Sequence, residues 1–322
     1  MFSTRSLAID QSQDLDHSVP KISDMITREG RADWRALNRS PFTFHHNLQS
    51  HPLFELSRLT RVAERAIEGR RNLFIPENEE LNRLPWKERF AEAIRRLEKG
   101  SLWLKIIRVY ELDPDYGDFL HSILTEIEDL SGEPLRAVWG SLTVIIASPN
   151  VVTPYHFDHE SNFLFQITGE KDLRVFDTSV VTQEEIERYY AGEALAGKYR
   201  DELMNRSVLF HLVPGLAAHH PPLAPHLVNN SNNVSVSVSV AYSDRALYER
   251  AKIYQANYCL RCLGFQPDPP GENTFRERLK LAAIGALAKS SPRTFDEMFS
   301  GINKVLLPQR CANRLSRWVS RR

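Results

Sequence analysis

The sequence predicts a mainly β core with helical regions before and after it. Two apolar runs, residues 144–147 and 162–167, have the composition of buried strands, and residues 234–242 alternate serine with valine. Apolar residues recur at helical spacing on either side of this region. We therefore divide the chain into a polar arm (1–32), an N-terminal region of helices and strands (33–135), a β core (136–243) and a C-terminal helical region (244–322).

In the N-terminal region, residues 42–47 lead into the first of three predicted helices. These helices cover residues 52–69, 85–99 and 118–130, with short strands at 72–75 and 102–109. Pro85 suits the first turn of the second helix, because proline needs no backbone N–H there. Gly132 suits the end of the third helix, because glycine accepts the left-handed conformation.

Within the core, Thr168, Gly169 and Glu170 form a predicted turn, and Lys171 opens the next strand at 172–176. A helical insert is predicted over residues 184–195, followed by strands that begin at Val208 and Val234. Beyond the core, helices are predicted over 244–263, 273–289 and 294–306. We expect these last helices to form a homodimer.

The composition is typical of a globular enzyme. The 322 residues are 42% hydrophobic and 25% charged, with a formal net charge of zero, which argues against broad electrostatic binding to nucleic acid or membrane. No signal-peptide or membrane-spanning pattern is visible, so we expect a cytoplasmic protein. The basic residues of 310–322 fit a solvated helix face and tail. Cys259 and Cys262 are interpreted as reduced helix cysteines.

The most informative motif is His156-Phe157-Asp158. Side chains two residues apart on an extended strand point to one face, so an imidazole and a carboxylate converge there. Such a tripeptide alone is a weak signal. A second histidine, His226, precedes the serine–valine run, and two histidines with one carboxylate are the ligand set of non-haem Fe(II) oxygenases.

The surroundings of this motif carry a family resemblance. The segment 140–245 resembles the cupin-like, jumonji-C-type 2-oxoglutarate oxygenases, especially the asparaginyl hydroxylase that acts on hypoxia-inducible factor. The matching residues are Thr153, Pro154, His156, Asp158, Asn162, Phe163, Gln166, Ile167, Gly169, Lys171, Pro221, Pro222 and His226.

The resemblance implies a double-stranded β-helix, or jelly roll, as the core. It implies that His156, Asp158 and His226 hold Fe(II), and that Lys171 binds the distal carboxylate of 2-oxoglutarate, with Thr153 and Asn162 in the same pocket. The expected reaction uses O2 to hydroxylate an unactivated C–H bond of an amino acid, a natural product or a peptide. Succinate and CO2 would be the co-products.

Several alternatives stay open. His219 and His220 compete with His226 for the third ligand position, although the Pro-Pro turn and the following strand favour His226. His159 is expected to face away from the metal. Two other functions compete: a metal-dependent cupin that does not use 2-oxoglutarate, against which Lys171 argues, and a non-enzymatic binding or regulatory module, against which the complete ligand set argues.

Overall fold

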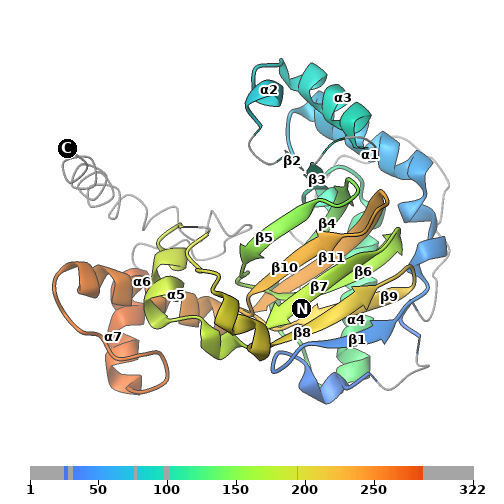
Figure 1. Ribbon diagram of the computed structural model, residues 1–322. Coiled ribbons are helices and arrows are strands. Elements are labelled where there is room, and N and C mark those ends of the chain that lie inside the picture. The colour runs from blue at the N-terminus through green and yellow to red at the C-terminus, as the bar shows by residue number, and fades with distance from the viewer. Residues whose placement is uncertain are drawn as a thin grey trace, which may run out of the picture.

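The computed structural model describes residues 25–27, 32–75, 78–97, 100, 102–193 and 195–285. Its centre is a pair of antiparallel sheets (Figure 1). The larger sheet has the order β1-β9-β6-β11-β4-β3-β2 and the smaller has the order β5-β10-β7-β8. The larger sheet contains β1 (Phe42–His45), β2 (Leu73–Phe74), β3 (Trp103–Ile106), β4 (Ala137–Ala147), β6 (Ser161–Thr168), β9 (Leu216–His220) and β11 (Ser235–Asp244); the smaller contains β5 (Val152–His156), β7 (Lys171–Phe176), β8 (Ser207–Leu212) and β10 (His226–Asn230).

The eight strands from β4 to β11 form a double-stranded β-helix. Following the chain, β4, β6, β9 and β11 lie in the larger sheet, whereas β5, β7, β8 and β10 lie in the smaller one. The chain therefore winds between two facing sheets, and the predicted fold class is confirmed. The strands β1, β3 and β2 extend the larger sheet beyond this core.

Alternation along the strands explains why the two sheets enclose a separate interior. In β11, Val238 and Val240 join the large core beneath the N-terminal helices, so Ser237 and Ser239 face the smaller sheet. The interior between the sheets is a small apolar cluster that includes Leu164, Leu173, Val175, Leu212 and Ala218.

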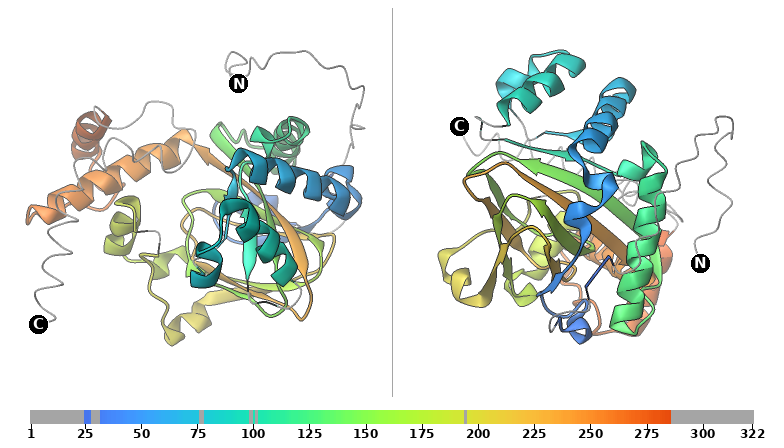
Figure 2. Two further views of the ribbon diagram at one scale, coloured as in Figure 1. Left: turned by 90° about the horizontal axis from the view of Figure 1, so that it is seen from above. Right: turned by 90° about the vertical axis from the view of Figure 1, so that its right-hand side faces the viewer.

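The N-terminal helices cover the outer face of the larger sheet, as the right-hand view of Figure 2 shows for α4. Gly132 ends α4 with a φ of 69°, as predicted. Residues 42–45, which precede the first long helix as expected, form strand β1, because they pair with β9. The helices of this region are α1 (Leu56–Gly69), α2 (Glu79–Asn82), α3 (Trp86–Arg96) and α4 (Asp115–Ser131), with short 3-10 turns at Trp34–Ala36, Leu48–Ser50, Pro52–Phe54 and Val109–Glu111.

A second group of helices lies together on one side of the barrel (Figure 1). It consists of α5 (Gln183–Tyr190), α6 (Arg245–Cys262) and α7 (Thr274–Gly285), with 3-10 turns at Thr178–Val180 and Asp201–Arg206 nearby. Thr182 and Glu185 form a capping box at the start of α5. The helix ends at Tyr190 rather than Leu195, because the chain turns at Gly192 with a φ of 94°.

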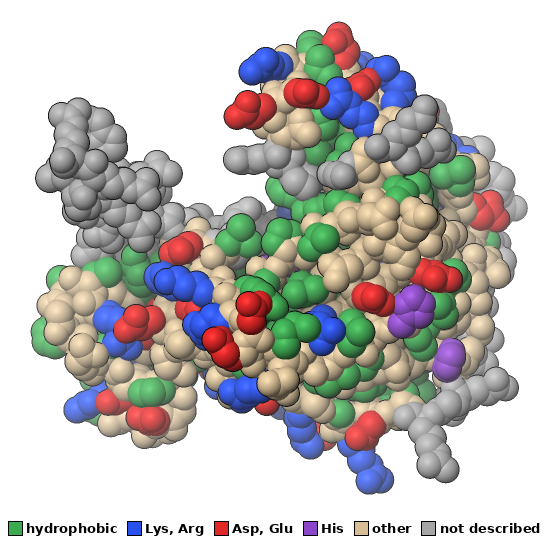
Figure 3. All heavy atoms as spheres, viewed as in Figure 1, with side chains coloured by type: hydrophobic (Ala, Val, Ile, Leu, Met, Phe, Trp, Pro, Cys, Tyr) green, Lys and Arg blue, Asp and Glu red, His purple; other side chains and the backbone are tan. Residues whose placement is uncertain are grey.

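Some predictions fall on other parts of the chain. The polar arm (apart from residues 25–27 and 32), the helix at 294–306 and the basic segment 310–322 lie outside the described residues. Among the helices that the structure does describe, none has both the length and the apolar character needed to cross a bilayer. On the face seen in Figure 3, acidic and basic side chains are interspersed.

Candidate metal centre

The three predicted metal ligands meet where β5 ends and β10 begins. His156 is the last residue of β5 and lies opposite His226, the first residue of β10, with ring centroids 4.2 Å apart. Asp158 Oδ2 lies 3.7 Å from His226 Nε2. Each residue offers one ligand atom, and these atoms all lie within 4.8 Å of one another, which is the arrangement of a metal-binding triad.

One premise of the sequence argument is wrong. Because β5 ends at His156, Asp158 does not share a strand with it. The carboxylate reaches the site from the following loop, where the Leu223 N–H donates a 2.8 Å hydrogen bond to the Asp158 carbonyl oxygen. This bond ties the loop to the segment that leads into β10, so both halves of the triad are fixed to each other.

Backbone carbonyl groups set the orientation of both imidazoles. His156 Nδ1 lies 2.7 Å from the Pro154 oxygen, and His226 Nδ1 lies 3.1 Å from the Ala224 oxygen. A carbonyl can only accept a hydrogen bond, so each Nδ1 carries the proton and each Nε2 keeps its lone pair for a metal.

The electrostatics favour the metal-binding protonation states. Burial acts to raise the pKa of Asp158, but His156 and His226 lower it well below its usual value. Burial, with His156 and His220 adding to the effect, lowers the pKa of His226 well below its usual value. At neutral pH the site therefore offers a carboxylate and a neutral imidazole, which can take a divalent cation without first losing protons.

Lys171 projects into the interior between the sheets. It opens β7 opposite Asn230, and side chains two apart along these strands continue through Leu173 and Val175 to His226 on the same face. Lys171 is 3% exposed, and burial lowers its pKa to about 7. Within the described residues its amino group has no ion pair or hydrogen bond, so the interior holds a basic group without a matching anion.

Thr153 shares this face because of a β-bulge. His226 and Val228 lie opposite His156 and Thr153, so two steps along β10 match three along β5. The extra residue reverses the alternation, and Thr153 points to the same side as His156 although the two are three residues apart. Regular alternation would have turned one of them away.

Asn162 lies on the inner face of β6, where a polar network covers part of the larger sheet. Its Nδ2 donates a 2.9 Å hydrogen bond to Ser239 Oγ. Further along the same strands, Ser237 Oγ donates a 2.7 Å bond to Gln166 Oε1. Ser237 and Ser239 of β11 therefore line the interior.

The two competing histidines have different environments. His219 faces the outer core, where its Nε2 accepts a 3.1 Å hydrogen bond from the Asn38 N–H and its ring packs 4.8 Å from Phe163. His220 points inward, with its ring centroid 4.2 Å from that of His226, and burial lowers its pKa to about 4. His220 thus lies beside the triad, while His219 is part of the apolar packing.

His159 packs away from the ligand atoms. It is buried, and its Nδ1 lies 2.6 Å from the hydroxyl oxygen of Tyr190 on α5. The loop that carries Asp158 is thereby attached to the helical group on one side of the barrel.

Two titratable residues beside the triad were not predicted. Lys105 on β3 lies opposite Ile145, and its charge acts to lower the pKa of both Asp158 and Glu160. Burial, followed by the neighbouring Asp158, raises the pKa of Glu160 to about 8. The sequence contained a strand at 102–109, but no signal placed that strand beside β4.

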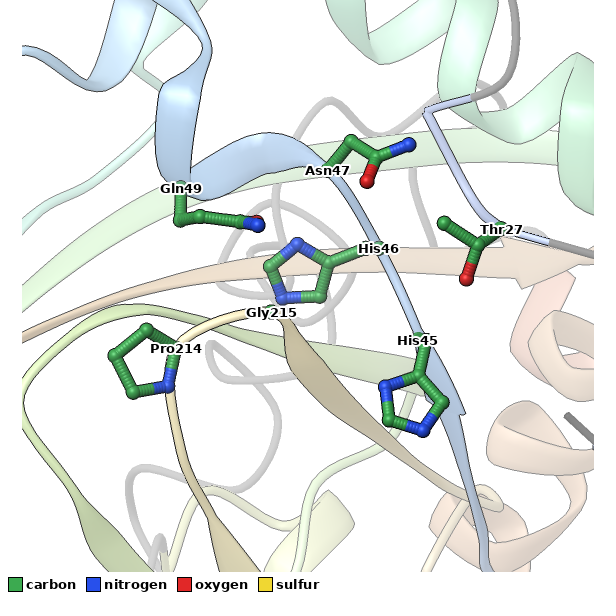
Figure 4. Close-up of a pocket in the computed structure, with 7 residues that line it drawn as sticks. All are labelled: Thr27, His45, His46, Asn47, Gln49, Pro214 and Gly215. Carbon is green, nitrogen blue, oxygen red and sulfur yellow. The ribbon is translucent and has the colours of Figure 1, made fainter. Parts of the chain in front are cut away.

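A separate polar pocket of about 380 Å3 lies near the end of β1 (Figure 4). None of the predicted site residues lines it. Its walls are held by local bonds: His46 Nδ1 accepts a 3.0 Å bond from the Leu48 N–H, and the His46 N–H donates a 2.9 Å bond to the Gly215 oxygen. The lining residues are Thr27, His45, His46, Asn47, Gln49, Pro214 and Gly215.

Comparisons with known proteins give distant structural likenesses. No family model matches the chain, and no curated protein matches its sequence. Escherichia coli ycfD has 16% identity and a TM-score of 0.42, covering 82% of this chain and 68% of that one. YcfD from Escherichia coli, described as a ribosomal oxygenase in complex with cobalt and 2-oxoglutarate, has 14% identity and a TM-score of 0.39, covering 76% and 62%. The coconut allergen cocosin has 17% identity and a TM-score of 0.24, covering 34% and 23%.

The strand order and ligand positions of the chain itself are more informative than these likenesses. Eight strands wind between two sheets, and a histidine, an aspartate and a second histidine meet at the end of β5 and the start of β10. The chain thus has a double-stranded β-helix that carries a His-x-Asp…His triad able to hold a metal ion.

Proposed function

We propose that the protein is an Fe(II)- and 2-oxoglutarate-dependent oxygenase that hydroxylates an unactivated C–H bond. The observation that carries this proposal is the pairing of a metal-binding triad with the unpartnered ammonium of Lys171 on one inner face. Val175 lies opposite His226, and Lys171 is four residues away along β7, which is about 13 Å of strand. A five-carbon diacid and the lysine stem together can span that distance.

Each residue of the site has a definite task in this proposal. His156, Asp158 and His226 hold the metal from one side and leave its other positions open. Lys171 orients the distal carboxylate of the co-substrate, and the Thr153 hydroxyl donates to it from the same face. When bound, iron with 2-oxoglutarate and O2 supplies the oxidising power, and succinate and CO2 are the co-products.

The interior favours this chemistry by excluding water. Leu173 and Val175 lie on the Lys171 face of β7, and Leu164 lies opposite on the larger sheet. An apolar lining strengthens the attraction between Lys171 and a carboxylate, because little solvent screens the pair. The proposed substrate is an amino acid, a natural product or a peptide.

The two alternative functions fit the site less well. An enzyme of this fold that did not use 2-oxoglutarate would bury the Lys171 ammonium without a partner. A purely binding or regulatory module would not need a carboxylate beside two imidazoles whose tautomers are fixed by the Pro154 and Ala224 carbonyl groups.

Calorimetric titration of 2-oxoglutarate into the Mn(II)-loaded, anaerobic protein tests the proposal. Lys171→Ala should weaken binding by about 100-fold or more, because it leaves a desolvated carboxylate unpaired. Thr153→Val, which removes one hydroxyl, should weaken it by about tenfold or less. Mn(II) affinity should be unchanged in both variants. Unchanged 2-oxoglutarate affinity in Lys171→Ala would favour a metal-dependent enzyme of another class.

A further inference from the structure

We propose that Phe74, Trp103 and Lys105 form a substrate platform beside the metal centre, and that this platform binds an acidic peptide. The inference rests on the proposed function, since it assigns a substrate class to the same site.

The three side chains lie on one face of the larger sheet. Lys105 lies opposite both Phe74 on β2 and Ile145 on β4, and directly opposite residues share a face. Trp103 is two residues from Lys105 and therefore shares it too. Ile145 packs against the apolar cluster between the sheets, so the platform continues the floor of the interior.

The platform extends past the edge of the smaller sheet. That sheet ends at β5, whereas the larger sheet continues from β4 into β3 and β2 (Figure 1). The opposite face of these strands is closed, because Leu104 and Ile106 are buried in the core beneath the N-terminal helices. Among the described residues, the face of β2 and β3 that is left open is therefore the one on the side of the metal triad.

The chemistry of the platform combines aromatic rings with a cation. Phe74 is 44% exposed, and its ring centroid lies 5.5 Å from that of Trp103. Lys105 Nζ lies 5.0 Å from the centre of the Trp103 ring, which holds the ammonium in place without neutralising it. Lys105 has no ion pair with any carboxylate of the described residues. The surface thus offers apolar contact and one free positive charge.

The unpaired charge of Lys105 favours an acidic ligand. Within the described residues its ammonium lies over the Trp103 ring and has no ion pair. A carboxylate of a ligand can therefore pair with this ammonium, whereas the like charge of a basic ligand is disfavoured.

The length of the platform favours a peptide over a single amino acid. Two strand spacings separate Ile145 on β4 from Phe74 on β2, or about 10 Å. A ligand that contacts Phe74 and also places a C–H bond at the metal centre must span more than this distance. An extended peptide segment of several residues does so, with an acidic side chain at Lys105.

Selection from a random peptide library tests the platform. The probe is the library itself, presented to the anaerobic protein loaded with Mn(II) and 2-oxoglutarate. Peptides bound to the unaltered protein should be enriched in Asp and Glu, and Lys105→Glu should replace this with enrichment in Lys and Arg. Acidic peptides selected on the unaltered protein should bind Lys105→Glu about tenfold more weakly. Trp103→Ala should weaken the binding of these peptides without changing the charge preference of the selection.

The chain offers a matched control. Lys252 also lies over an aromatic ring, 4.2 Å from the centre of Tyr248 on α6. Lys252→Glu changes the net charge by the same amount, so it should leave the selected peptides unchanged. A shift as large as that of Lys105→Glu would mean that net charge alone decides the outcome, and would overturn the platform.

Two further measurements test whether Lys105 acts directly and separate the platform from the proposed function. Glu160→Gln should preserve the acidic preference, and its loss would show that Lys105 acts through Glu160 instead. Measuring 2-oxoglutarate affinity on every variant separates the two proposals. Normal 2-oxoglutarate binding with no acidic enrichment, or with no selected peptide, overturns the platform alone. Acidic enrichment without 2-oxoglutarate binding overturns the proposed function alone.

Discussion

Two backbone carbonyl groups determine which nitrogen of each candidate ligand faces the metal. The Pro154 and Ala224 oxygens accept from Nδ1 of His156 and His226, and both lie two residues before the histidine they orient. This short-range device explains why a linear motif could reveal the site. Each ligand carries its orienting group within its own segment of sequence.

Removing one ligand should remove the metal. His226→Ala leaves one imidazole and one carboxylate, so Mn(II) or Fe(II) affinity should fall by about 100-fold or more. Metal content after anaerobic loading and desalting measures this loss. His219→Ala is the control, because His219 packs in the outer core. Full metal content in His226→Ala, together with loss in His219→Ala or His220→Ala, would contradict the assignment.

Burial of Lys171 makes 2-oxoglutarate binding depend on pH. Its pKa is about 7 in the free protein, and a bound carboxylate raises that pKa. Affinity should therefore be nearly constant below pH 7 and fall above it, by at most about tenfold per pH unit, until the pKa of the complex is passed.

Proton uptake measures the same linkage. At pH 8, calorimetry in two buffers of different ionisation enthalpy should show uptake of about one proton per 2-oxoglutarate. The Lys171→Met variant should bind 2-oxoglutarate weakly, and its affinity should depend less on pH above pH 7. Absence of uptake in the unaltered protein would mean that Lys171 is already charged, or that it does not meet the carboxylate.

At the scale of elements, the sequence revealed strands of strong composition and missed short ones. The runs that became β6, β7 and β11 were predicted, since their alternation or apolar character is clear. No separate strand was predicted for β9 or β10, because each has five residues and follows a Gly or Pro segment. The bulge that turns Thr153 inward depends on pairing with β10 and has no local signal.

One ion pair fastens α5 to α6. Arg261 Nε lies 2.7 Å from Glu187 Oε2, and Glu187 is almost fully buried. Arg261→Ala leaves that carboxylate unpaired and should lower the free energy of unfolding by about 2 kcal/mol, less than for a fully buried pair because Arg261 is partly exposed. Denaturant unfolding measures the change. Arg245→Ala removes a more exposed ion pair with Glu249 and should lower the free energy of unfolding by less than about 1 kcal/mol. Equal effects would contradict this account.

At the scale of the whole molecule, the fold class could be predicted but the extent of the larger sheet could not. The β core could be predicted because its motif and its strand pattern both lie within residues 140–245. The addition of β1, β3 and β2 depends on pairing between distant segments, such as Phe42 with His219. For the same reason, the sequence did not indicate that Lys105 lies beside the metal centre. The domain boundaries and a cytoplasmic location stay predictions.

The C-terminal helices are predicted to form a homodimer. The segment from α6 to α7 exposes Leu263, Phe265, Phe275 and Leu279, which a second copy could cover. Light scattering of the full chain should give twice the chain mass, and Phe275→Glu should give the monomer. Leu56→Glu, on the exposed surface of α1, is the control and should stay dimeric. A monomeric unaltered chain would rule the prediction out.

The most direct test of the central claim is conversion of 2-oxoglutarate to succinate. The protein is supplied with Fe(II), O2, ascorbate and labelled 2-oxoglutarate, with and without a pool of acidic peptides, and products are followed by mass spectrometry. The account predicts succinate and a peptide gain of one oxygen atom, both abolished in His226→Ala and strongly reduced in Lys171→Ala. Succinate formation no greater than that of His226→Ala, with peptides and without them, would contradict it.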